Sequence, residues 1–306
     1  MRGTTSKADF DLFASAVACF PPSARHGKTA QAVFEEGYEA LSALAKKKPP
    51  FARAIGWKAY VLALSVHEEW SLPPKAPEAK MSAQARLDEA LRLARMAVKQ
   101  DDTDHDLHWA LADVHLIRGE FKDSVAAFDE AIRLNRDERH PSLFVDAATA
   151  MMQAGDFDRA ETLFRKARMP DWHNWSRGIF LFLKAGRATA DRETFLNLAL
   201  DELKATRMQI GDDFYQSEVQ LVLAAVHWRK AELFDQKAAS TKDPADHALF
   251  TRLAAQSRGA AARAIQGFHG AFHHWSPAVA GMSLPLDSKA DTDWWQDTVK
   301  ALWSIP

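Results

Sequence analysis

The sequence predicts an all-α protein, a right-handed α-solenoid of antiparallel helix pairs that ends in a C-terminal helical cap. The first observation behind this is an internal repeat, because residues 104–135 and 140–171 share a pattern at a constant offset of 36. Four residue pairs keep this offset: Gly119 and Gly155, Phe121 and Phe157, Phe128 and Phe164, Ala131 and Ala167. The second is the helical spacing of apolar residues in the flanking segments. A period in the thirties, with a glycine before the second helix, is typical of helix-turn-helix units that stack into a solenoid.

Each repeat has the parts of a closely packed helix pair. In the first repeat, Leu107, Leu111 and His115 share one face of the first helix. Gly119 ends that helix and Phe121 fills the turn. Small residues let two helices approach closely, and aromatic rings fill the space between neighbouring pairs.

This pattern resembles the tetratricopeptide repeat (TPR), whose consensus is W-x2-L-G-x2-Y, then A-x3-F, then P. Leu111-Ala112 matches the Leu-Gly pair, and Phe128 matches the aromatic of the second helix, with Ser124 in place of Ala. The second repeat holds a full A-x3-F from Ala160 to Phe164. A third, more divergent copy keeps a Trp at 175, a Gly at 186 and a Phe at 195, and a degenerate copy precedes the first. We therefore expect three regions. N-terminal helices over 1–50 pack on the solenoid, and a long helix pair with a Trp-rich capping helix covers 207–306. Between them lie TPR-like repeats over 51–206, at about 51–102, 105–138, 141–171 and 172–206.

A second, narrower resemblance covers roughly residues 50–190. Four segments carry it, in chain order: Trp70-Ser-Leu-Pro-Pro, LRLARMAVKQDD, HWALADVHLIRGEF and MPDWHNWSRGIFLFLKAGR. Together they are similar to the repeat domain that follows class III adenylate cyclase domains and some winged-helix regulators in bacteria. The sequence holds no cyclase or DNA-binding domain beside it. The resemblance therefore implies only the role of the repeat module.

The flanking helices follow from caps and breakers. We expect a helix over 8–19 that ends before Pro21-Pro22, and a helix over 29–47 that ends at a basic run and Pro49-Pro50. Two more helices should follow over 51–70 and 82–100. Near the C-terminus, aspartates predict helix starts at 213 and 244, with ends near 238 and 274. The last helix, 291–303, holds Trp294, Trp295 and Trp303. A terminal repeat must cover its apolar face, so we favour a cap over an exposed docking patch.

Composition narrows the functional classes. Apolar residues make up 47% and charged residues 26% of 306 residues, which is ordinary for a soluble protein. The net charge of −2 predicts no general attraction to nucleic acid or anionic membrane, and no apolar run is long enough to span a bilayer. Cys19 is the single cysteine, which suits a reducing cytoplasm. Asp9 and Asp11 interrupt the apolar core that a lipoprotein signal would need before it.

Candidate chemistry is sparse. His269, His273 and His274 could share a metal ion, but no carboxylate or cysteine stands nearby, so we expect a histidine-rich helix end and no metal. His105 and His108 lie at the start of a repeat, where packing explains them better. No nucleophile and base can be paired from the sequence, and we expect neither catalytic residues nor a cofactor.

The remaining candidate is a binding surface. In TPR arrays, first-helix residues that face away from the second helix line a concave groove. By spacing these include Asp106, Trp109, Asp113, Leu116, Val145, Thr149, Met152, Phe180 and Lys184. Family members that bind chaperones use Lys, Arg and Asn there to hold a peptide carboxylate. The aspartates and apolar groups here favour instead an apolar or amphipathic helix with a basic residue. The chain's own C-terminal helices could equally fill the groove.

The sequence thus predicts a non-enzymatic scaffold of a bacterial cytoplasm that captures a protein or peptide partner in its groove, without nucleic acid or membrane. A homo-oligomer stays open. The alternative is a small-ligand sensor or regulatory subunit of a bacterial signalling system, with a pocket walled by Trp and Phe side chains.

Overall fold

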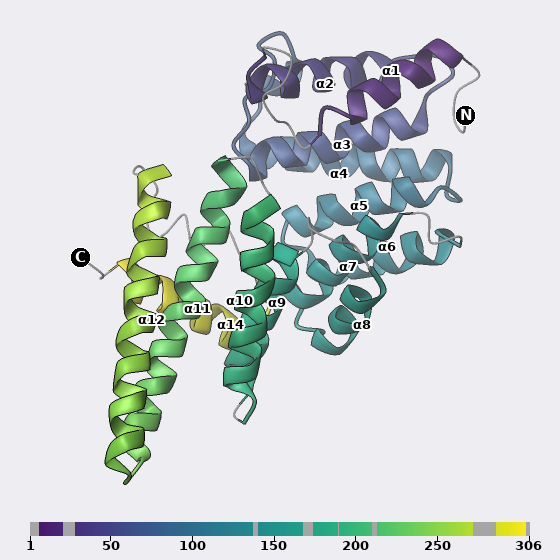
Figure 1. Ribbon diagram of the computed structural model, residues 1–306. Coiled ribbons are helices and arrows are strands. Elements are labelled where there is room, and N and C mark those ends of the chain that lie inside the picture. The colour runs from purple at the N-terminus through teal and green to yellow at the C-terminus, as the bar shows by residue number, and fades with distance from the viewer. Residues whose placement is uncertain are drawn as a thin grey trace. The chain divides into compact units, whose positions relative to one another are not determined.

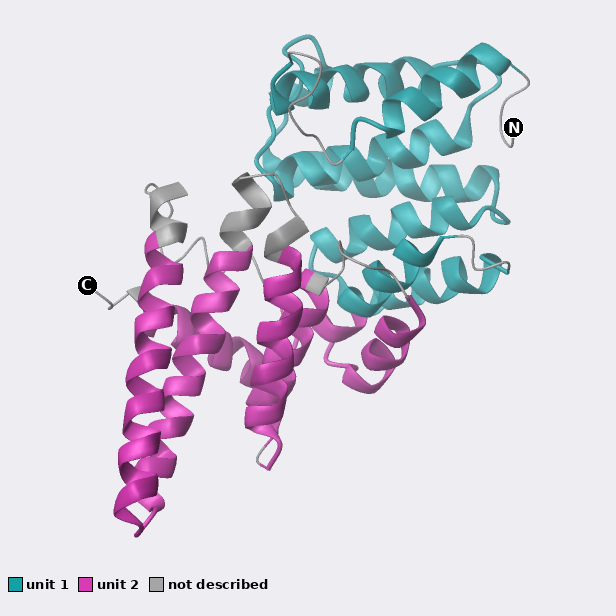
Figure 2. Cartoon of the chain, in the orientation of Figure 1, with its two compact units in different colours: residues 1–150 teal, residues 151–306 magenta. Residues whose placement is uncertain are grey.

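The predicted all-α class is confirmed by the computed structural model (Figure 1). The structure describes residues 6–20, 28–136, 140–167, 174–188, 190–209, 213–271 and 286–303. The chain divides into two compact units, residues 1–150 and 151–306 (Figure 2). In chain order the helices are α1 (Lys7–Val17), α2 (Ala30–Ala45), α3 (Ala52–His67), the 3-10 turn η1 (Pro77–Lys80), α4 (Ala83–Gln100), α5 (His105–Ile117), α6 (Phe121–Leu134), α7 (Pro141–Gln153), α8 (Phe157–Ala167), α9 (Asn174–Arg187), α10 (Arg192–Gln209), α11 (Asp213–Ser240), α12 (Pro244–Ala271) and α14 (Lys289–Trp303).

Most helices begin at a polar residue whose side chain accepts a hydrogen bond from the first turn. Ser6 caps α1, Thr29 caps α2 and Ser82 caps α4, each with an oxygen to nitrogen distance of 3.2 Å. Asp104 caps α5 in the same way by accepting from the Asp106 amide. Side chains of this kind satisfy amides that have no partner inside the helix, which is why the predicted starts agree closely with the structure.

One predicted helix ends early. The segment 51–70 is helical only to His67, because Glu69 takes a left-handed backbone conformation with φ +56°. Glutamate rarely adopts this conformation, so the sequence gives no sign of the turn.

Unit 1 is built around α3. This helix packs on α2, α4 and α5, and the large side chains at its core are fully buried: Phe34, Tyr38, Leu41, Leu44, Ile55, Leu62 and Leu107. Lys58 and Glu78 are also buried and form an ion pair at 2.6 Å, which ties α3 to η1. The segment between α3 and α4, which contains Pro73, Pro74 and Pro77, is therefore fixed to the core.

The two repeated glycines make the same turn. Gly119 ends α5 with φ +75° and Gly155 ends α7 with φ +84°. In each case the next amide reaches back five residues, from Glu120 to the His115 carbonyl at 2.9 Å and from Asp156 to the Met151 carbonyl at 2.8 Å. A left-handed residue after a helix closes this pattern of bonds, and glycine adopts it without steric cost. The predicted helix breaks are confirmed.

Ser124 shows how α6 is held to α5. It is fully buried, and its hydroxyl donates to the Ala112 carbonyl at 2.9 Å. The serine that replaces the consensus alanine is thus small enough for close packing and also satisfied.

Unit 2 contains α8 to α14, in which α11 and α12 form a pair of 28-residue helices. The last helix, α14, packs on α9 and α11 and buries Trp295, Val299 and Leu302. Trp295 is thus covered within the unit, Trp294 is partly exposed, and the side chain of Trp303 lies outside the described residues. No helix in the described parts of the chain combines the length and apolar character needed to cross a bilayer.

The predicted division into 1–50, 51–206 and 207–306 remains a prediction. The boundary between the two compact units falls after residue 150, inside α7 and therefore inside the second predicted repeat.

Candidate functional site

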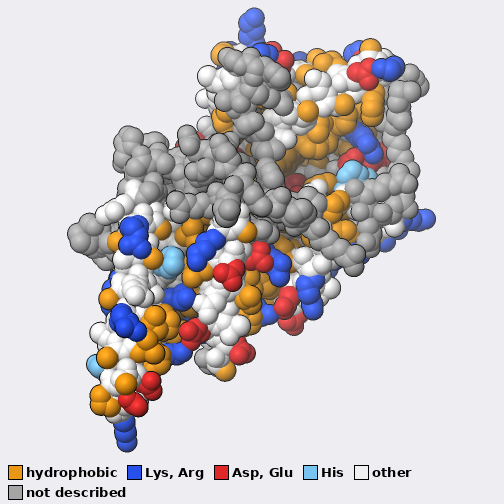
Figure 3. Space-filling view, in the orientation of Figure 1, with side chains coloured by type: hydrophobic (Ala, Val, Ile, Leu, Met, Phe, Trp, Pro, Cys, Tyr) orange, Lys and Arg blue, Asp and Glu red, His pale blue; other side chains and the backbone are white. Residues whose placement is uncertain are grey.

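The first helices of the pairs in unit 1, α3, α5 and α7, present a common stripe of partly exposed side chains, which we call the A-helix face. It runs over Arg53, Trp57, Tyr60, Asp106, Trp109, Asp113, Leu116, Ser142, Asp146 and Thr149. Two contacts join the three helices into one surface: Arg53 pairs with Asp106 at 3.1 Å, and Trp109 hydrogen-bonds to Asp146 at 3.1 Å. Over the part of unit 1 where α3 and α5 lie, hydrophobic side chains gather beside acidic, basic and histidine side chains (Figure 3).

Five of the predicted groove residues lie on this face: Asp106, Trp109, Asp113, Leu116 and Thr149 are all partly exposed. Val145 and Met152 differ from the expectation, because each is only 1% exposed and belongs to the core. The helix turns about 100° per residue, so Ser142, Asp146 and Thr149 follow one line along α7. Val145 and Met152 lie to the side of that line, toward the packed interior.

Phe180 and Lys184 belong to unit 2. Phe180 is 2% exposed and packs between Phe157 and Phe164, with ring centroids 5.5 and 5.3 Å away. Lys184 pairs with Glu161 at 2.7 Å and lies 4.8 Å above the Phe195 ring. Phe180 thus lies in the core of its unit instead of lining an open groove, and both residues are left out of the A-helix face.

Asp146 is the site residue that sequence spacing missed. The offset of 36 aligns Trp109 with Val145, whereas the structure brings Trp109 against the next residue along α7. The available signal was the polar series Ser142, Asp146 and Thr149 at positions i, i+4 and i+7, which marks one face of a helix.

Asp113 and Asp146 form an acidic pair on this face. Burial raises the pKa of Asp146 to about 7, although the hydrogen bond from Trp109 opposes the rise. Burial raises the pKa of Asp113 well above its ordinary value, and the Asp146 charge raises it further. Both residues are nevertheless partly exposed at the surface of unit 1. Ionising such a pair without a counter-ion costs free energy, and perturbed carboxylates of this kind gather at functional sites.

At the start of α5 a single arginine pairs with two aspartates. Arg53 Nε donates to the Asp104 carboxylate at 2.6 Å, and Arg53 Nη1 lies 3.1 Å from Asp106. Beside Arg53 along α3, Trp57 and Tyr60 pack edge to face with centroids 5.7 Å apart. The A-helix face therefore combines aromatic area, one end where Arg53 pairs with aspartates, and one acidic pair that has no cation among its described partners.

Two side-chain groups in the described residues have the chemistry of a metal site. His105, Asp106 and His140 lie at the start of α5 and just before α7, and His115, Glu120 and Asp123 lie at the turn between α5 and α6. In the second group, His115 Nδ1 is already bonded to Glu120 at 2.6 Å, and Glu120 also holds Arg118 at 2.8 Å. That group works as a helix-end network. The side chain of His269, and the whole of His273 and His274, lie outside the described residues.

Unit 1 also contains a pocket of about 510 Å³, on the far end of α3 from the Arg53 pairs. Its wall includes Ser65, Glu69, Trp70, Leu72 and Arg86. Trp70 stacks on Phe34 at 5.6 Å, and Arg86 donates to the Glu78 and Ala79 carbonyls. The pocket is thus formed by the C-terminal end of α3 and the segment between α3 and α4.

No protein-family model matches the chain, and no curated protein sequence is significantly similar to it. Among solved structures, it is similar to a thermophilic TPR protein of Thermus thermophilus, with 14% identity, a TM-score of 0.48 and coverage of 68% of this chain and 94% of that one. It is also similar to the nuclear import adaptor Nro1 of S. pombe, with 12% identity, a TM-score of 0.44 and coverage of 99% of both chains.

A TPR protein of Parabacteroides merdae gives 11% identity, a TM-score of 0.43 and coverage of 91% of this chain and 98% of that one. At identities and TM-scores this low, these likenesses carry no argument about partner or activity. The function of the chain is therefore argued from the geometry of the A-helix face.

Proposed function

We propose that the chain is a non-enzymatic binding module that captures a protein segment on the A-helix face. The observation that carries the proposal is the partly exposed acidic pair Asp113 and Asp146 beside the Trp109 indole. Helical-repeat arrays use extended surfaces of this kind for binding. The single cysteine, Cys19, is buried and free, which supports a reducing compartment such as a bacterial cytoplasm.

The acidic pair defines the first feature of the partner. Two neighbouring carboxylates whose pKa values are raised cannot both ionise cheaply, and a cation that arrives between them relieves this cost. An arginine or lysine of the partner supplies such a cation, and arginine can bind carboxylates with two parallel hydrogen bonds. We therefore infer a basic side chain at the centre of the bound segment.

The aromatic residues define the second feature. Trp57, Tyr60 and Trp109 are partly exposed, so each can bury more apolar area against a ligand. Tryptophan and tyrosine carry much of the binding energy in protein interfaces. The segment that fits is thus amphipathic, with apolar residues on both sides of a lysine or arginine.

Selection from a random peptide library on the purified protein tests this proposal directly. We expect enriched peptides to carry Lys or Arg between apolar residues. Trp109→Asp should abolish their binding while helicity stays unchanged, and Asp146→Asn should weaken it roughly tenfold, which corresponds to about 1.4 kcal/mol.

Asp158→Asn is the matched control, since Asp158 is an exposed aspartate of α8 in unit 2. It should leave binding unchanged. Enrichment of acidic peptides, or equal binding by wild type and Trp109→Asp, would exclude the A-helix face as the binding surface.

A second candidate function rests on the 510 Å³ pocket at Trp70. Its volume lies within the range of small-molecule sites, and Glu69 in its wall holds the strained φ of +56°. This supports a small-ligand sensor or regulatory subunit of a bacterial signalling system. A thermal-shift screen of metabolites tests it, because a ligand at 100 times its dissociation constant adds about 2.7 kcal/mol of stability. A hit whose shift survives in Trp70→Ala would place the ligand elsewhere.

A further inference from the structure

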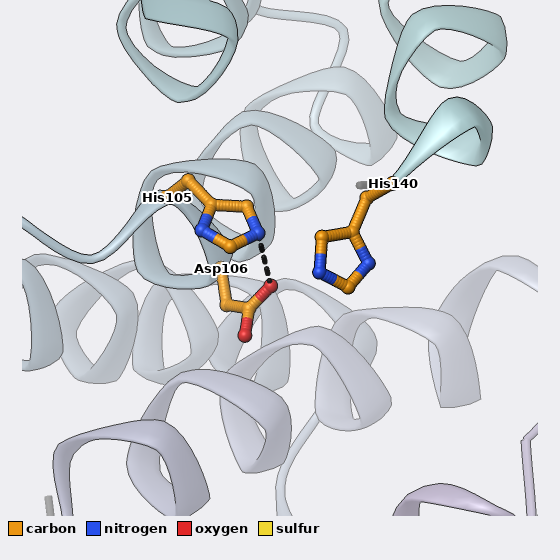
Figure 4. Close-up of side chains that lie close together, drawn as sticks. All are labelled: His105, Asp106 and His140. Atoms are coloured by element: carbon orange, nitrogen blue, oxygen red, sulfur yellow. Dashed lines mark ion pairs between the residues drawn. The ribbon is translucent and has the colours of Figure 1, made fainter. Parts of the chain in front are cut away.

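At the end of the A-helix face, three side chains with metal-binding atoms converge. His105 and Asp106 open α5, and His140 directly precedes α7. The imidazole rings of His105 and His140 lie 4.8 Å apart between centroids, and His105 Nε2 is 3.1 Å from Asp106 Oδ1. The candidate ligand atoms of all three lie within 4.8 Å of one another. In Figure 4 one ring nitrogen of each histidine faces the Asp106 carboxylate.

The atom at the centre of this group lacks a partner. His105 Nε2 is buried and finds no hydrogen bond of good geometry among the described residues, although Asp106 Oδ1 is close to it. Buried polar atoms are nearly always satisfied, so this nitrogen needs an explanation, and a bound ion is one of the usual ones. The three side chains thus bring candidate metal ligands together around a nitrogen that has no hydrogen bond.

The surrounding charges favour a cation here. Asp104 and Asp106 face Arg53, so the two carboxylates exceed the one guanidinium by a single negative charge.

We propose that His105, Asp106 and His140 form a binding site for a divalent transition-metal ion such as Zn²⁺. Two imidazole nitrogens and one carboxylate oxygen are a known ligand set for zinc. Bonds of about 2.0–2.1 Å in tetrahedral geometry place neighbouring ligand atoms about 3.3 Å apart. The separation of 3.1 Å between His105 and Asp106 is close to this, and a His140 nitrogen lies within 4.8 Å of both other ligand atoms, so it would move toward them on binding.

An ion at this site would join two consecutive repeats. It would fix the first turn of α5 to the residue that precedes α7, beside Trp109, whose ring lies 6.5 Å from the His140 ring. Three protein ligands leave one tetrahedral position for water or for a side chain from another molecule. The site stands apart from the acidic pair that is proposed to bind a basic segment, because its ligands include neither Asp113 nor Asp146, although Asp106 also lies on the A-helix face.

The test uses the full chain without a histidine tag, stripped with a chelator. Zn²⁺ is titrated by calorimetry, and Co²⁺ is titrated by absorption spectroscopy. We expect one ion per chain, a Co²⁺ spectrum of tetrahedral type, and a loss of affinity of tenfold or more in His105→Ala and in His140→Ala. His140→Cys should retain the ion and add a thiolate-to-cobalt absorption band, which a residue with only a packing role would not produce.

Two controls separate this site from other histidines. His108→Ala removes a histidine of the same helix whose Nε2 is bonded to the Asp102 carbonyl, outside the proposed set. The triple variant His269→Ala, His273→Ala, His274→Ala removes the histidines near the end of the chain. Both should bind Zn²⁺ as wild type does. Absence of Zn²⁺ binding at micromolar concentration, or unchanged affinity in His140→Ala and His105→Ala, overturns the proposal.

Discussion

Trp109 on α5 donates its indole N–H to Asp146 on α7 at 3.1 Å, across 37 residues of sequence. The bond ties an aromatic side chain of one repeat to a carboxylate of the next. It also keeps that carboxylate on the A-helix face beside Asp113, where burial raises the pKa of both groups. The same two side chains thus fix the stacking of the repeats and create an acidic pair that is costly to ionise.

Asp146→Asn should stabilise the free protein at neutral pH, on the order of 1–2 kcal/mol once exposure is taken into account. Asparagine keeps an oxygen that can accept from Trp109 but carries no charge. The pKa of Asp146 is about 7 in the folded chain and near 4 when unfolded. The folded state therefore binds its proton more tightly, and the wild type should lose stability as pH rises from about 4 through about 7.

Chemical denaturation of both proteins at pH 5 and pH 8 measures this effect. The gain from the substitution should be larger at pH 8, and Asp158→Asn, at an exposed aspartate of unit 2, is measured beside it as the control. An equal or larger gain at pH 5 would contradict the raised pKa. A residue whose removal stabilises the chain but weakens peptide binding is one that serves function rather than folding.

Glycines at corresponding places in the repeats should respond differently to asparagine. Gly119 has φ +75° and open space around its Cβ position, so only its backbone conformation requires glycine. Asparagine tolerates that conformation, so Gly119→Asn should cost less stability than Gly119→Ala, which should lower the free energy of unfolding by about 1 kcal/mol.

Gly186 has an ordinary helical backbone, but an added Cβ would lie 2.9 Å from the Trp294 ring. Gly186→Ala and Gly186→Asn should both destabilise unit 2, and denaturation curves of the four variants compare these costs.

These glycines also show how far the sequence could predict the fold. The offset of 36 identified Gly119 and Gly155 correctly, because a left-handed turn is a local requirement that a local pattern can record. Gly186 was aligned with them as a third turn, but it lies inside α9 and allows Trp294 of α14 to approach. That requirement is set by a helix more than a hundred residues away, which spacing cannot reveal.

The candidate site was predictable to the same extent. Trp109 and Asp113 follow from the spacing of α5, since one face of a single helix can be read from its sequence. Asp146 could not be separated from Val145 in that way, because the rotation of α7 is decided by its packing against neighbouring helices. The convergence of His105 and His140 also depends on how one repeat stacks on the next, and no local pattern records it.

Glu78→Gln should destabilise unit 1 by roughly 3 kcal/mol, because it leaves the buried ammonium of Lys58 without its counter-charge. Replacing both partners with apolar residues, Lys58→Met with Glu78→Leu, should recover most of the loss. Burial alone would raise the pKa of Glu78, but the hydrogen bond and charge of Lys58, a backbone hydrogen bond and the Tyr38 hydroxyl together outweigh burial, and the pKa is lowered. The pair therefore contributes stability above the ordinary pKa of 4.5 and loses it as pH falls further. Acid titration of wild type and the double variant checks this, since only the wild type should lose this contribution.

Asp291→Asn should release α14 from unit 2 without unfolding the rest. Asp291 is 4% exposed and receives both arms of the Arg187 guanidinium, with Arg187 Nε at 2.9 Å from Oδ1. The same guanidinium lies 3.7 Å above the Phe157 ring, so the pair connects α14, α9 and α8. Because a neutral asparagine cannot compensate the arginine charge, amide exchange should accelerate along Lys289–Trp303 while α2 to α5 keep their protection.

Asp293→Asn is the matched control, since Asp293 lies in the same helix and makes an exposed pair with Lys289. If both variants exchanged alike, the Arg187 pair would not be what holds the cap, and the buried Trp295 and Leu302 would have to suffice.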